Sequence, residues 1–205
     1  MAVAVPATVF AEGEHARRAG TELLVLLGDI EKLRNGGLPE KQTRGLRDRI
    51  AGSLSGLPLL LRLADQEKGR LPALFDINRL PVPLSRNELP VLVEEIAGLV
   101  SAYPFQGTGI FFAQASAARI RNALQLHKSL CAGCHDFPNL DMERPAFNLF
   151  LQAKKLPEQE FAARMLVGIR GDVVTGLGNP FTDEEIAALI SLYRSVKSSA
   201  EAGQH

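Results

Sequence analysis

Tryptophan is absent from the sequence, tyrosine occurs only twice, and neither sign of charge is in excess. The 23 lysines and arginines balance 23 aspartates and glutamates, so the formal net charge is zero. Binding of nucleic acid phosphates requires a basic surface, and binding of unpaired bases requires aromatic side chains on which they stack. These absences argue against a nucleic acid as partner. The hydrophobic share of 46% is typical of a globular protein.

Long apolar runs are also missing. No run approaches the roughly 20 residues that cross a bilayer, so we expect no transmembrane segment. Residues 1–11 (MAVAVPATVFA) are apolar and end in Val-Phe-Ala, which resembles the end of an export signal with its small-residue cleavage site. The positively charged start of such a signal is not present. Two interpretations stay open, a remnant of an export signal and an ordinary N-terminus.

Apolar residues recur at helical spacing along most of the chain, and no period-two alternation persists. Helices are predicted at residues 21–34, from 40 onwards, and at 89–100, 110–130, 157–169 and 182–196. Pro58 is expected to kink or divide the second helix, and the proline-rich residues 71–84 are expected to form a loop. The predicted fold class is all-α. We expect an antiparallel helical bundle at 12–107, followed by a compact helical domain at 108–205.

The two cysteines of the chain lie close together, in the segment Cys131-Ala132-Gly133-Cys134-His135. Two thiols three positions apart near the end of a helix can add to the two vinyl groups of one haem. The adjacent histidine can then direct its imidazole at the iron as the proximal ligand. The pattern predicts one covalently bound haem c, and with both thiols in thioether bonds no disulfide is available.

Three other interpretations compete with haem attachment. A thioredoxin-like redox pair requires a βαβ context, whereas helices are predicted on both sides of the motif. A structural zinc site requires a second pair of ligands, and His15, His127 and His205 do not supply one at a typical spacing. A chance match would need one of only four histidines to follow the second cysteine.

From about Ala117 to Val196 the sequence resembles a class I c-type cytochrome domain. That family begins with a helix that runs into Cys-x-x-Cys-His, matched here by residues 123–131. It continues through a loop containing a proline, for which Pro145, ten positions after His135 (145−135), is the candidate. It ends with a helix that opens in a Thr/Ser-Asp-Glu-Glu pattern, matched at residues 182–189, where Thr182 and Glu185 also form a capping-box sequence.

The resemblance implies thioether bonds from Cys131 and Cys134, His135 as iron ligand, and Pro145 as the loop residue that orients this histidine. It also implies that the first and last helices of the domain cross. It covers about 80 residues, and only the haem motif within it is highly specific. The helical region at 12–107 lies outside it.

The sequence departs from this family on the distal side of the iron. Electron carriers of the class place a methionine in the loop before the last helix, and residues 171–181 contain none. Asn179, directly before Pro180, stands where that methionine would fall, and it is also an ordinary residue for a turn. Met165, on the preceding helix, is the other candidate distal ligand, with core packing as its default role. Met142 is a weaker candidate.

Three further side chains have two interpretations each. His127, four positions before Cys131, can ligate a metal, but the family often has a packed aromatic residue there. We therefore favour a packed histidine. Arg164 and Arg170 can pair with haem propionates or can simply be solvated.

The leading functional hypothesis is a monohaem electron carrier that is exported to the periplasm and exchanges electrons with a redox partner protein. The alternative is a haem protein with open or weakly ligated iron that binds a small ligand or performs redox catalysis. Within that alternative, binding of a gas demands fewer residues than catalysis does. The amphipathic helices of 12–107 are expected to pack on one another, and a homo- or hetero-oligomer through them is a further hypothesis.

Overall fold

The computed structural model describes residues 13–71, 87–107, 109–111, 115–168 and 180–195, and over these ranges the protein is all-helical. The helices are α1 (Glu14–Asn35), α2 (Glu40–Glu67), α3 (Leu89–Ala102), α4 (Ala117–Leu126), α5 (Ala132–His135), α6 (Leu149–Lys155), α7 (Glu158–Val167) and α8 (Asp183–Ser195). A π-helical turn, His127–Cys131, joins α4 to α5. The predicted all-α class is thus confirmed.

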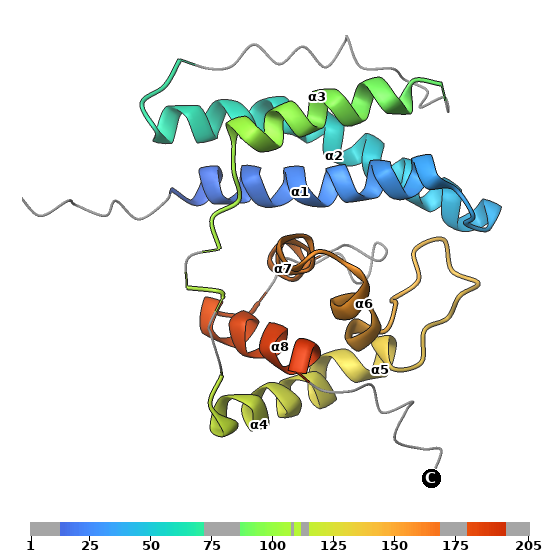
Figure 1. The fold of residues 1–205 in the computed structure, drawn as a ribbon, viewed down its shortest axis with the longest axis vertical. Helices are drawn as coiled ribbons and strands as arrows, with labels where there is room; N and C mark the ends of the chain where they lie inside the picture. The colour runs from blue at the N-terminus through green and yellow to red at the C-terminus, as the bar shows by residue number, and fades with distance from the viewer. Residues whose placement is uncertain (1–12, 72–86, 108, 112–114, 169–179, 196–205) are drawn as a thin grey trace, which may run out of the picture.

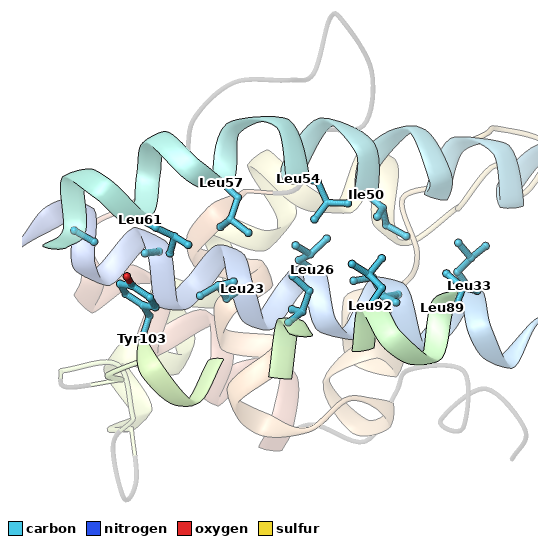
Figure 2. Packing of buried hydrophobic residues seen from close by; sticks show 14 of the residues in the cluster. Leu23, Leu26, Leu33, Ile50, Leu54, Leu57, Leu61, Leu89, Leu92 and Tyr103 are labelled. Atoms are coloured by element: carbon cyan, nitrogen blue, oxygen red, sulfur yellow. The ribbon is translucent and has the colours of Figure 1, made fainter. Parts of the chain in front are cut away.

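Helices α1, α2 and α3 form the N-terminal part of the structure, with α1 packed against both of the others (Figure 1). Each of the three carries leucines and isoleucines at helical spacing, so each buries one stripe. Figure 2 shows these stripes meeting in one core, closed at one end by Tyr103. Tyr103 donates a hydrogen bond of 2.8 Å to Asp65, which satisfies a buried hydroxyl.

Of the two outcomes predicted for Pro58, a kink or a division of the second helix, division does not occur. Helix α2 runs without a break from Glu40 to Glu67, with Pro58 inside it. Leu54, Leu57 and Leu61 stay buried on either side of the proline, against the common core. Burial of this stripe stabilises the helix more than the loss of one backbone hydrogen bond, about 3 kcal/mol, destabilises it.

The C-terminal part forms a second core. Helix α8 packs against α4, α6 and α7, and Phe161, Leu189 and Tyr193 are fully buried there. The predicted capping box at the start of α8 is confirmed. The Thr182 backbone N–H and hydroxyl both donate to Glu185 at 2.8 Å, and these bonds lower the pKa of the Glu185 carboxyl.

The two parts meet where α1 packs against α7. Asp29, which is 2% exposed, accepts hydrogen bonds from Arg49 of α2 at 2.6 Å and from Arg164 of α7 at 2.9 Å. Glu160 accepts from Arg164 as well, at 2.7 Å. Burial alone would lower the pKa of Arg164, but the Asp29 and Glu160 carboxylates raise it above its ordinary value. This charged cluster joins the two cores.

The cores divide between Tyr103 and Phe105, close to the predicted boundary at 107, although the division into domains stays a prediction. Residues 1–11 lie outside the described residues, and so does nearly all of the predicted loop at 71–84. Helix α6 was not predicted. Along the described helices, none is long and apolar enough to span a bilayer.

Candidate functional site

The Cys-x-x-Cys-His segment lies where α4 gives way to α5. The backbone widens into the π-helical turn at His127–Cys131 before the short helix at Ala132–His135. A π-helical turn changes which side chains share a face of a helix, and such turns are frequent at functional sites. Here the turn buries His127 and Cys131, while Cys134, one turn later, is exposed.

His135 is held by a backbone carbonyl. Its Nδ1 lies 2.6 Å from the carbonyl oxygen of Phe147. Because a carbonyl only accepts, Nδ1 carries the proton and donates it, which leaves Nε2 of the neutral ring with its lone pair. Nε2 has no hydrogen-bond partner among the described residues. A histidine in this state is prepared to bind a metal ion through Nε2.

Pro145 does not itself supply the orienting carbonyl. Its carbonyl oxygen accepts a hydrogen bond of 3.0 Å from the Phe147 backbone N–H. Pro145 thus shapes a tight turn, and Phe147, two residues later, presents its own carbonyl to His135. The sequence pointed to the loop and not to this residue, because any residue type can offer a backbone carbonyl.

The two thiols have different surroundings. Burial raises the pKa of Cys131, and a hydrogen bond from the Tyr193 hydroxyl acts in the opposite direction. The side chain of Cys134 is exposed. Cys134 is therefore the more accessible nucleophile, and Cys131 is the more buried of the two thiols.

His127 is a packed histidine, as favoured above. It is 3% exposed, with Nδ1 at 3.0 Å from the Tyr193 hydroxyl and Nε2 at 3.2 Å from the Asp136 carboxylate. Its ring also meets the rings of Phe150 and Tyr193 edge-on, at centroid distances of 5.2 Å and 5.5 Å. This aromatic cluster joins the π-helical turn that contains Cys131 to α6 and α8. Tyr193 was assigned only to the apolar stripe of the last helix, and its hydroxyl was not predicted to bind His127 or Cys131.

Large apolar side chains around the motif stay exposed. Leu130 precedes the first cysteine and is 63% exposed, and Phe137, two residues after His135, is 84% exposed. Leu140 and Met142 in the following loop are exposed too. Single exposed apolar residues are ordinary, but these four lie within one stretch of 13 residues, 130–142, that includes the motif.

Comparison of the chain with protein-family models, with curated proteins and with solved structures finds no match.

The distal candidates have separate outcomes. Met165 is partly buried and packs against the C-terminal core, in agreement with its default role, and nothing tests it as a ligand. Asn179 lies outside the described residues, as does Arg170. Arg164 is neither solvated nor available to a propionate, since Asp29 and Glu160 bind its guanidinium.

The other interpretations of the motif receive no support. In the part of the chain that the structure describes, no three His, Cys, Asp or Glu side chains come together as a group that could hold a metal ion. The described residues on both sides of the motif are helix or loop, without the strands that a thioredoxin-like pair needs.

Proposed function

We propose that the chain is a monohaem c-type cytochrome that transfers electrons through one haem bound by Cys131, Cys134 and His135. The observation that carries the proposal is the state of His135. Its Nδ1–H is donated to the Phe147 carbonyl and its Nε2 keeps a lone pair, next to two thiols in the spacing that haem attachment requires.

The residues around the motif fit a covalently bound haem in three respects. No disulfide joins Cys131 to Cys134 in the structure, and Cys134 is open to a reactant. The exposed Leu130, Phe137 and Leu140 offer apolar contact to a porphyrin, which is itself largely apolar. Helix α4 packs on α8, which is the helix pair that the resemblance leads us to expect beside the motif.

When bound, a haem supplies an iron that gains and loses one electron. The protein's own residues set the conditions for that exchange. His135 would ligate the iron through Nε2. The Phe147 carbonyl fixes the ring by accepting the Nδ1 proton, and this bond would raise the basicity of Nε2. The cluster of His127, Phe150 and Tyr193 keeps the helix that carries Cys131 in place.

The alternative function, binding of a small ligand at open or weakly held iron, rests on the distal side. Residues 171–181 contain no methionine, and Met165 is engaged in core packing. A sulfur ligand blocks the iron and raises its potential, whereas an oxygen or nitrogen donor leaves it accessible to small molecules. We retain electron transfer as the leading function because it requires no distal acid–base residue.

Carbon monoxide distinguishes the two functions. For an electron carrier ligated by Met165, the reduced protein should not change its visible spectrum with carbon monoxide, and the oxidised protein should show a methionine–iron charge-transfer band. Met165→Ala should then lose that band and bind carbon monoxide, while the matched Met142→Ala should behave as the wild type. Ready binding of carbon monoxide by the wild type would favour the alternative function, with Asn179 as the next residue to replace.

Covalent haem attachment in bacteria takes place outside the cytoplasm, so the proposal includes export to the periplasm and electron exchange with a partner protein there. The apolar residues 1–11 are consistent with export.

A further inference from the structure

The N-terminal helices have no part in the family resemblance, yet they hold the loop that orients His135. The loop between α5 and α6 rises toward the turn that joins α1 to α2 (Figure 1). Its far end supplies the Phe147 carbonyl that accepts the proton of His135 Nδ1. Whatever fixes this loop therefore also fixes the histidine.

Three polar contacts connect the first turns of α2 with the loop. The Gln42 side-chain amide donates to the Leu140 carbonyl at 2.8 Å, and Gln42 is buried. Arg44 pairs with Glu143 at 3.0 Å, and because both side chains are exposed this ion pair contributes little to holding the loop. In the opposite direction, the Arg144 side chain donates to the backbone carbonyl of Gly45 at 3.3 Å.

Gly45 brings the two backbones into direct contact. A Cβ atom at this position would lie 2.5 Å from the carbonyl oxygen of Glu143, and its neighbour is backbone that cannot rotate away. The absence of a side chain at Gly45 is thus what allows α2 to approach the loop so closely. In contrast, a Cβ at Gly52, two turns further along the same helix, would meet nothing within 4 Å.

Helix α1 contacts the loop at the orienting residue itself. The ammonium of Lys32 lies over the ring of Phe147, 4.5 Å from its centroid. Lys32 is partly buried, and burial together with the charges of Arg49 and Arg164 lowers its pKa. The contact holds the ring of the residue whose carbonyl His135 uses.

We propose that α1 and α2 serve as a positioning scaffold for the proximal histidine, in which Gly45, Gln42 and Lys32 set the strength of the hydrogen bond from His135 to Phe147. The inference rests on the proposed function, and it gives helices α1 and α2 a role. A shorter Nδ1–H···O bond makes Nε2 a stronger donor to iron and stabilises the oxidised state. Loosening the scaffold should therefore raise the reduction potential.

The test compares Gly45→Ala with Gly52→Ala in the haem-loaded protein. Both changes add one methyl group to α2, but only the first displaces the loop. We expect Gly45→Ala to raise the reduction potential and to accelerate solvent exchange of the His135 Nδ1 proton at least tenfold, measured by NMR on the reduced, histidine-labelled protein. Gly52→Ala should match the wild type in both. Unchanged potential and exchange in Gly45→Ala, with only a lower melting temperature, would overturn the inference.

A second pair of variants serves if Gly45→Ala does not fold. Gln42→Leu removes the hydrogen bond to the Leu140 carbonyl without adding bulk. It should raise the reduction potential and accelerate exchange of the His135 Nδ1 proton, as Gly45→Ala does. Lys32→Met should have the same two effects, whereas Lys32→Arg should keep the wild-type values. Variants that equal the wild type would again overturn the inference while leaving the proposed function intact. Absence of haem from the wild-type chain would instead refute the proposed function and the inference with it.

Discussion

Replacing both cysteines, in a Cys131→Ala/Cys134→Ala variant, should abolish covalent haem attachment completely. These are the only thiols in the chain, so no other side chain can form a thioether with a haem vinyl group. The variant should be produced alongside c-type maturation machinery, denatured, and stained for haem after electrophoresis. Wild-type protein should keep its haem through denaturation, and the variant should carry none.

Single replacements refine this result. Cys134→Ala should retain haem through one thioether at Cys131, with a reduced spectrum shifted to longer wavelength because one vinyl group stays conjugated. Ser129→Ala, which changes an exposed hydroxyl two residues before Cys131, is the control and should attach haem normally. Haem that survives denaturation in the double variant would contradict the assignment of the thiols.

Asp29→Ala should produce a large loss of stability. The substitution removes the buried carboxylate that binds Arg49 and Arg164, so Arg49 loses this carboxylate and Arg164 keeps Glu160 as its partner. Breaking a buried ion pair from one side typically costs about 3–5 kcal/mol. Because Asp29 lies where the two cores meet, we expect unfolding of both to begin at lower denaturant concentration.

Asp48→Ala is the matched control, since Asp48 is an exposed aspartate on the neighbouring helix α2. Its effect on the free energy of unfolding should stay within about 0.5 kcal/mol. Urea titrations followed by circular dichroism measure both variants. A free energy of unfolding for Asp29→Ala equal to that of Asp48→Ala would show that the cluster does not join the cores energetically.

The helices were predictable where their signals are local. The leucine stripes of α1 and α2 and the capping box of Thr182 and Glu185 depend on residues a few positions apart, and the structure contains all of them. Division of the helix at Pro58, one of the two predicted outcomes, does not occur, because the rule for proline in a helix describes only a local cost. The burial of Leu54, Leu57 and Leu61 against other helices outweighs it.

The sequence indicates the candidate reactive residues of the site but not the residues that support them. Cys131, Cys134 and His135 lie within five consecutive positions, and the prediction of haem attachment rests on that spacing. The carbonyl of Phe147 is a backbone group, and no feature of the sequence distinguishes it from the other backbone carbonyls. Arg164 was expected beside a propionate or in solvent, but Asp29, 135 positions away, binds it. Such pairs depend on the packing of α1 against α7, which no local pattern encodes.

The most direct test of haem binding is the mass and visible spectrum of the full chain, produced with c-type maturation machinery and purified under denaturing conditions. We predict a mass increased by that of one haem and, after reduction in alkaline pyridine, the absorption bands of a haem with two thioether bonds. A mass equal to that of the polypeptide alone, with no haem absorption, would contradict the account at its centre.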